Sequence, residues 1–431
     1  MRRGLALLCC LLCLSLSSLA HARHVIGHQE PPEETPATPA EREKEAKGYA
    51  LESLLVRGEY TVIPLPAFSY TRNESFYIGA LAPTLRAKQE GIVTEIIAPQ
   101  YLYNPFVGHT GTLNYYVYPS DTIQYRAIVN YSEKVARDFD FAYRDIGAGG
   151  GRYILAAQVN WFKNPFARFF GIGNDTSEDS ETDYTSREFL AKGTVGINLG
   201  PDFSVMFTER YHEVRVENGI LTTLLDTKTK LAGSNLPGLE GARILGHQLM
   251  VRYDTRDNLL TPSKGTYVTV SLELSQNLQP SEPDRWGRYI IDARHLIPHA
   301  AGRMVFGARL LIDGVTGDRI PFYERPTLGG ENTLRAFGLS RFIDDWATVV
   351  NLEERIIVKE QRFFEHLVGL EIAPYLDLGR VTSNFGERLR RIQFNPGVGF
   401  RLVQKPNVVG RLDLAYGRDG SNAFVGLDYP F

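Results

Sequence analysis

The feature that most constrains the fold of this chain is an alternation of apolar and polar residues, which returns from about residue 58 to the C-terminus. It is clearest from Val368 to Leu378, where Leu370 and Ile372 share one face and Glu371 and Asp377 share the other. Successive side chains of a strand point to opposite faces, so each such segment predicts a two-faced strand. No stretch of this region is apolar for the roughly 18 residues that a membrane helix requires. The pattern fits a transmembrane β-barrel and also a soluble sandwich with one wet face.

The lengths of the strands and of their connections favour the membrane barrel. The strands are about 10 residues long, their polar faces carry Gly, Arg, Asp and Glu together, and short connections alternate with long ones from mid-chain onward. The short connections lie near 200–202, 298–302 and 404–407, and the long ones near 218–243, 276–286, 317–346 and 382–395. Short turns at one end of a barrel and long loops at the other produce this rhythm.

Counting back from the C-terminus assigns strands near residues 423–431, 408–417, 397–403, 367–380, 348–358, 303–315, 288–297, 265–275, 244–255, 203–216 and 187–199. If the strands and loops of region 58–186 have the same lengths, that region supplies about five more, which gives about 16, an even number as in bacterial barrels. Six runs compete for these places: 76–85, 92–104, 112–118, 122–131, 139–143 and 152–162. The predicted fold class is therefore an all-β, antiparallel, 16-stranded barrel over residues 58–431.

The N-terminus has the order of a secretory signal peptide. Met1-Arg2-Arg3 precedes an apolar run that ends near Leu19, and Ala20-His21-Ala22 supplies a small-residue cleavage site, so residues 1–22 are expected to be removed. A membrane-anchoring helix and a lipoprotein are the alternatives. All three cysteines lie within this segment, at positions 9, 10 and 13, so the exported chain would have no disulfide and no thiolate metal site.

Residues 23–57 are rich in Pro, Glu, Lys and Ala and contain too few large apolar residues to offset the entropy of ordering. They predict a disordered periplasmic tail, with a short helix from Ala40 to Leu55 as an alternative for its second half.

Composition and motifs exclude several classes of function. The net charge of −3 and a pI near 6.3 give no basic face for nucleic acid. The chain contains no Gly-x-Ser-x-Gly, no His-Glu-x-x-His and no phosphate-binding glycine loop, and its nine histidines are scattered without ligand spacing. We therefore expect no enzyme, no cofactor and no metal site.

The C-terminus ends in Gly426-Leu427-Asp428-Tyr429-Pro430-Phe431. If the last strand stays extended, Ala423, Val425, Leu427, Tyr429 and Phe431 share an apolar face that ends in two aromatics at the membrane interface, where aromatic girdles lie. Gly426, Tyr429 and Phe431 are similar to the C-terminal targeting signal of outer-membrane proteins, which implies insertion by the cell's barrel-assembly machinery. Two residues depart from that signal. Phe424 stands where the signal usually has a polar residue, and Pro430 has no amide to donate to a ladder.

Residues 321–342 carry the most specific motif. Gly329-Gly330 is followed by Arg335-Ala336-Phe337, and this segment resembles the sixth extracellular loop of the BamA/TamA superfamily of outer-membrane assembly barrels, also called the bacterial surface antigen family. Two further segments resemble that superfamily, at residues 169–176 and around 254–258 with Pro262 and Gly265. The family has glycine where Ala336 stands, and a glycine needed for positive φ would leave alanine strained.

The resemblance implies a loop that is folded into the barrel and anchored there by Gly329, Gly330, Arg335 and Phe337. A guanidinium can bind a carboxylate through two parallel hydrogen bonds. The resemblance implies Glu353 and Asp377, on the two strands after the loop, as the partners of Arg335. Alternation places Glu353 inward and Glu354 toward lipid, and a shift of one residue would exchange them.

Function follows from the resemblance only in part. The family implies a barrel in the outer membrane of a Gram-negative bacterium that assists insertion or translocation of outer-membrane proteins, working among outer-membrane lipids. Residues 23–57 are too few and too polar for even one of the family's periplasmic POTRA domains, so a separate periplasmic or lipoprotein partner would have to handle clients. The alternative is a channel in which the loop acts as a plug.

Overall fold

A computed structural model of the protein describes residues 56–57, 60–62, 64–87, 93–120, 122–258, 261–279, 284–363, 366–386, 391–404, 408–427 and 429–431. The predicted signal peptide (1–22) and almost all of the predicted tail (23–57) lie outside these residues. No helix within the described residues is both long and apolar enough to span a membrane.

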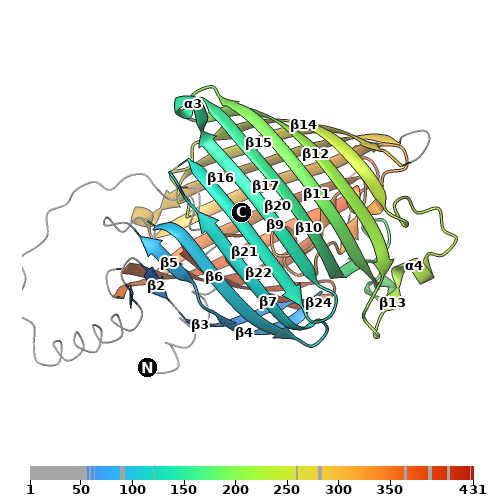
Figure 1. Ribbon diagram of the computed structural model, residues 1–431, viewed down its shortest axis with the longest axis horizontal. Coiled ribbons are helices and arrows are strands. Elements are labelled where there is room, and N and C mark those ends of the chain that lie inside the picture. Colours follow the sequence, from blue (N-terminus) through green and yellow to red (C-terminus); the bar gives the residue numbers. More distant parts are fainter. Residues whose placement is uncertain are drawn as a thin grey trace, which may run out of the picture.

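The described chain forms one antiparallel, nearly closed barrel of about 18 tilted strands (Figure 1). The all-β antiparallel barrel is thus confirmed. Each of the first two barrel strands consists of two segments. The first is formed by β2 (Tyr60–Val62) and β3 (Leu65–Thr71), and the second by β4 (Ser75–Leu81) and β5 (Thr84–Ala87). β2 pairs with β5, and β3 pairs with β4. The short β1 (Val56–Arg57) pairs with β2.

The remaining barrel strands follow in chain order, each paired with the next: β6 (Val93–Asn104), β7 (Gly108–Val117), β8 (Ile123–Ser132), β9 (Arg137–Gly147), β10 (Tyr153–Phe169), β11 (Thr182–Asn198), β12 (Phe203–Asn218), β14 (Ala242–Asp254), β15 (Gly265–Asn277), β16 (Arg285–His299), β17 (Met304–Gly317), β20 (Trp346–Phe363), β21 (His366–Thr382), β22 (Gln393–Gln404), β23 (Val408–Gly417) and β24 (Gly420–Leu427).

Small elements decorate the connections: β13 (Leu225–Asp226), β18 (Thr327–Leu328), β19 (Phe342–Ile343), the helical turns α3 (Ala148–Gly151) and α4 (Thr227–Lys230), and the 3₁₀ turns Glu178–Ser180, Ala300–Gly302 and Phe322–Glu324.

The predicted count of 16 strands does not match this structure. The eleven strands assigned from the C-terminus are all present, as are the six competing runs of the N-terminal region, but β2 and β3 were not predicted. The estimate assumed long loops, whereas β3 and β4 are separated only by residues 72–74, and β6 and β7 only by residues 105–107. Because these hairpins have tight turns, the N-terminal region holds more strands than its length suggested.

The barrel has two different ends and two different faces. One end carries the turns at 199–202 and 300–303, and the other carries the connections at 219–241, 318–345 and 383–392; we call them the short-turn end and the long-loop end. Large apolar side chains such as Leu249, Val270 and Leu272 are exposed on the outer face, whereas Ser271 and Glu273 of the same ladder are buried on the inner face. The alternation in the sequence therefore separates the outside of the barrel from its interior.

Candidate functional site: the interior loop and its wall

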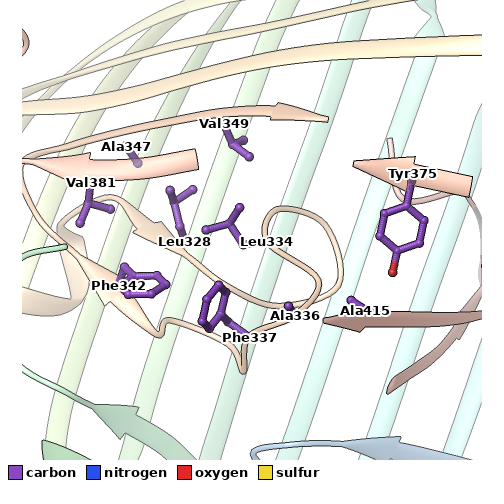
Figure 2. Packing of buried hydrophobic residues seen from close by; sticks show 10 residues of the cluster. All are labelled: Leu328, Leu334, Ala336, Phe337, Phe342, Ala347, Val349, Tyr375, Val381 and Ala415. Atoms are coloured by element: carbon purple, nitrogen blue, oxygen red, sulfur yellow. The ribbon is translucent and has the colours of Figure 1, made fainter. Parts of the chain in front are cut away.

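The connection from Asp318 to Asp345, between β17 and β20, packs against strands β20, β21 and β23. We call it the β17–β20 loop. Its residues Leu328, Leu334, Ala336, Phe337 and Phe342 are completely buried. They pack with Ala347, Val349, Tyr375, Val381 and Ala415 of strands β20, β21 and β23, as Figure 2 shows. A loop with such a core occupies a fixed position on the wall.

The two glycines and the alanine of the motif have distinct backbone roles. Gly329 and Gly330 have φ angles of 117° and 93°, which L-residues rarely adopt, and a Cβ on Gly329 would lie 2.2 Å from the carbonyl oxygen of Gly338. Ala336 does not have a positive φ, so the strain expected from replacing the family's glycine is absent. Its buried methyl group faces Gly417 of β23 instead.

Arg335 lies at the centre of a group of charges on strands β20 to β23. Its Nε and Nη2 donate to the two carboxylate oxygens of Asp377, at 2.9 and 2.8 Å, and its Nη1 donates to Glu353 Oε2 at 2.8 Å. The guanidinium carbon lies 3.3 Å from the ring centroid of Tyr375. Burial disfavours the charged form, but Asp377 and Glu353 outweigh it and hold the pKa of Arg335 above its ordinary value.

Glu353 joins this group to the strands beyond it. Its Oε2 also accepts from Arg401 Nη2 at 3.0 Å, and its Oε1 accepts from Arg355 Nε at 3.3 Å. Arg401 in turn lies 2.7 Å from Asp413 Oδ1. Glu354 faces the other way and binds His299 Nε2 at 2.8 Å. The structure thus brings Arg335, Glu353 and Asp377 together and leaves Glu354 out.

Arg401 and Asp413 are not predicted as site residues by the loop motif. The available signal was alternation, since Arg401 follows the inward positions Gly397 and Gly399, and Asp413 lies between Arg411 and Ala415. Only the barrel's register shows that the side chains of these two strands converge on Glu353.

A second attachment holds the start of the loop to β12. Glu324 Oε2 accepts from Arg210 Nη2 at 2.9 Å, and Glu324 Oε1 lies 2.9 Å from His212 Nδ1, both on β12. Burial raises the pKa of the Glu324 carboxyl, but His212 and Arg210 together hold it below its ordinary value. The β17–β20 loop therefore bridges the barrel interior between β12 and β20 to β23.

The loop also binds residues 170–176, which form the first part of the connection between β10 and β11. Gly173 N donates to Ile343 O at 2.7 Å, and Arg341 Nη1 and Nη2 donate to Thr176 Oγ1 and O, both at 2.9 Å. Both segments were noted for their resemblance to the same superfamily, and here they contact each other.

The C-terminus departs from the sequence prediction. Gly426 pairs with Arg411 in the last ladder, but the strand ends at Leu427, so Tyr429 and Phe431 do not continue an outer apolar face. The hydroxyl of Tyr429 donates to Glu371 Oε2 at 2.9 Å, and Phe431 is buried.

Arg355 fixes this terminal turn inside the barrel. Its guanidinium carbon lies 3.6 Å from the ring centroid of Tyr429, and its Nη2 donates to Phe431 O at 3.3 Å. The prediction of two aromatics at the membrane interface is therefore wrong. Pro430 cannot donate to a ladder, and the inward residues Arg355 and Glu371 offer partners that lipid does not.

The family model of the Omp85 superfamily domain matches residues 124–422. The chain belongs to the Omp85 superfamily. Among solved structures, this Omp85 barrel is similar to BamA from Haemophilus ducreyi lacking POTRA domains 1–3, with a TM-score of 0.53 and 13% identity over 89% of this chain and 77% of that one. It also matches CdiB from Acinetobacter baumannii, with a TM-score of 0.46 and 11% identity over 86% of this chain and 60% of that one. No curated protein matches its sequence.

Proposed function

We propose that this Omp85 barrel lies in the outer membrane of a Gram-negative bacterium and assists insertion or translocation of outer-membrane proteins through the seam between its first and last strands. The observation that carries the proposal is the seam itself. β3 and β24 lie side by side, yet within the described residues no ladder pairs them, although β3 is paired with β4 and β24 with β23. A cavity of about 630 Å³ opens there, lined by Tyr70 of β3 and by residues of β22 to β24.

Unpaired strand edges are templates for another strand. In a bilayer, backbone groups without partners are costly, so an edge of this kind gains stability when an incoming strand pairs with it. A client hairpin that adds to β3 or β24 would satisfy those groups while it enters the membrane from the side.

The β17–β20 loop contacts both sides of the seam at the long-loop end. Leu339 N donates to Asn73 Oδ1 at 3.0 Å, and Asn73 Nδ2 donates to Leu339 O at 3.3 Å, which holds the turn between β3 and β4. Arg341 Nε donates to Asp419 Oδ2 at 2.6 Å, which holds the turn between β23 and β24. Arg72 Nη1 also donates to Asp419 O across the seam, at 3.2 Å.

In our proposal the loop holds the two sides of the seam together through these contacts. Arg335 sets the position of the loop because it binds the loop to the wall of β20 to β23. Asn422 of β24 adds a bond to Arg335 O at 3.2 Å. In our proposal the seam opens when the contacts of Asn73 and Asp419 with the loop break, while the Arg335 anchor keeps the loop on β20 to β23. The expected partners are outer-membrane lipids, the barrel-assembly machinery for the protein's own insertion, and a separate periplasmic or lipoprotein partner.

Two measurements test the proposal. Depletion of the protein should reduce the amount of particular barrels in the outer-membrane proteome, and purified protein in liposomes should speed the folding of those barrels from urea. An unchanged proteome, together with a bilayer conductance that rises in Arg335→Ala, would contradict the proposal and support the plugged channel.

A further inference from the structure

A row of positive side chains crosses the outer face of the barrel near the long-loop end. Val159, which points to the same side of β10 as one member of the row, is 45% exposed, and Tyr131, which pairs with another member, is 57% exposed. The row therefore faces away from the barrel interior. We call it the cation row, and its members are direct partners across β9, β10, β11 and β12: Arg137, Lys163, Arg187 and Arg215.

The first three members of the row have one carboxylate between them. Glu217 Oε2 lies 2.6 Å from Lys163 Nζ, and its Oε1 lies 3.5 Å from Arg187 Nη1. Arg137 forms no ion pair with a residue that the structure describes. Its Nη1 donates to two backbone carbonyl groups, and its guanidinium carbon lies 3.5 Å from the ring centroid of Tyr131. Positive charge therefore exceeds negative charge from β9 to β11.

The other end of the row is also positive. Arg215 Nε and Nη2 both donate to Glu213 Oε1, at 3.0 and 2.8 Å, and Arg243 of β14 lies 3.7 Å from the second oxygen of the same carboxylate. Glu209, the next outward carboxylate on β12, lies 2.7 Å from His247 instead. Like charges directly opposite each other on neighbouring strands destabilise a sheet, so the row would be stabilised by an added anion.

Aromatic residues place the cation row at the depth of lipid headgroups. One outward position further from the long loops, Phe139, Trp161 and Phe189 pair with one another across β9, β10 and β11. The rings of Phe139 and Trp161 have their centroids 5.5 Å apart. Aromatic residues form girdles at the membrane interface, and an outward charge costs little there. The cations therefore lie on the headgroup side of such a girdle.

A groove on the same outer face lies below these aromatic residues. It has a volume of about 390 Å³, and the outward side chains that line it are aromatic or aliphatic. Ala127 and Ala157 leave space beside Phe141 and Tyr143, their direct partners. The edge at Val159 lies four residues, or roughly 13 Å, along the strand from the cation row. A hydrocarbon chain attached to a headgroup at the row can reach this groove.

We propose that the cation row and the groove bind a lipid with a net-negative phosphate headgroup, in the leaflet at the long-loop end. The phosphate binds Lys163 and Arg187, whose N–H groups are suited to phosphate oxygens, and one acyl chain lies in the groove beside Ala157. Each cation near a membrane surface favours anionic lipid, and the headgroup reduces the repulsion along the row. The site rests on the membrane location in the proposed function but not on protein insertion.

Trp161 can report which lipid occupies the site. The chain has three tryptophans, so Trp286→Phe with Trp346→Phe leaves Trp161 as the only one. The full chain with these changes is placed in phosphatidylcholine nanodiscs in which a fixed fraction of the lipid has brominated acyl chains, which quench tryptophan fluorescence on contact. Brominated phosphatidylglycerol is compared with brominated phosphatidylcholine. We expect a preference for phosphatidylglycerol of about fivefold, which one unbalanced cation near an anionic headgroup provides.

Variants separate the charges from the groove. Lys163→Gln with Arg187→Gln should abolish the preference, whereas Lys163→Arg should keep it. Ala157→Leu, which fills the groove and keeps every charge, should lower it at least twofold. Arg285→Gln is the matched control and should leave it unchanged, because Arg285 is exposed on β16, which β11, β12, β14 and β15 separate from β10. Native migration of each unboiled variant on gels establishes that it is folded.

Three results overturn the proposal. Equal quenching by the two lipids would show that Trp161 contacts lipid without a headgroup site, which leaves the membrane location intact. No quenching by either lipid would show that protein, such as a second copy of the chain, covers this face instead of lipid. A preference that survives in Lys163→Gln with Arg187→Gln, or that is the same in Ala157→Leu as in Arg285→Gln, would show that the lipid binds elsewhere. Client folding in liposomes is measured separately, so the two proposals fail independently.

Discussion

The wall of β20 to β23 and the wall of β8 to β11 are built from the same alternation, but their inward polar residues have different surroundings. On the first wall, Glu353 and Asp377 are at most 1% exposed, and both bind Arg335 of the β17–β20 loop. On the second, Arg126 retains 32% of its side-chain exposure beside Asp140. A loop of the same chain packs on the first wall, whereas the Arg126 side chain of the second wall is partly exposed. The ion pairs of the first wall are therefore buried and closely packed, whereas the pair of Arg126 with Asp140 on the second is partly exposed.

The largest difference between the two walls should appear when an arginine is removed. Arg335→Ala leaves Asp377 and Glu353 buried beside a missing partner, and breaking a buried pair in this way typically costs about 3–5 kcal/mol. Arg126→Ala removes a partly exposed pair, which is worth about 1 kcal/mol or less. Urea unfolding in detergent micelles measures both. Similar losses in the two variants would contradict the comparison.

A second contrast uses glycines at which a methyl group meets very different surroundings. A Cβ on Gly417 of β23 would lie 2.7 Å from the Cβ of Ala336 in the loop, whereas a Cβ on Gly193 of β11 has no atom within 4 Å. Overpacking of a filled core costs about 1–3 kcal/mol. Gly417→Ala should therefore lower the urea midpoint and loosen the loop toward proteases, and Gly193→Ala should leave both unchanged. A neutral Gly417→Ala would show that the loop is not packed on this wall.

The smallest expected effect concerns the terminal turn. Tyr429→Phe removes the hydrogen bond to Glu371, and one such bond contributes about 1 kcal/mol. Tyr416→Phe is the control, because Tyr416 is 64% exposed on the outer face. If the two variants unfold at the same urea concentration, the C-terminus does not lie inside the barrel as described.

The sequence predicts the parts of this fold that depend on local alternation. It places the eleven strands from β11 to β24 and favours Glu353 over Glu354 as the inward residue, because a strand's period of two depends on neighbouring residues alone. The number of strands is underestimated from the sequence because turn length varies along the chain. The alternation of apolar and polar residues carries no information about turn length.

Features that depend on contacts across the barrel were beyond the sequence. The inward turn of Tyr429 and Phe431 depends on Arg355, which is distant in the chain, and alternation alone extended the strand past Leu427. The approach of Arg401 and Asp413 to Glu353, and of Leu339 to Asn73, likewise follows from barrel register and loop packing.

A disulfide between the β17–β20 loop and the turn between β3 and β4 would keep the loop attached to the seam. Asn73→Cys with Leu339→Cys joins the loop to the turn between β3 and β4, in a chain whose three native cysteines all precede residue 14. Oxidised protein in liposomes should lose most of its stimulation of client folding, and a reductant should restore it. Equal stimulation by the oxidised and reduced forms would contradict the account.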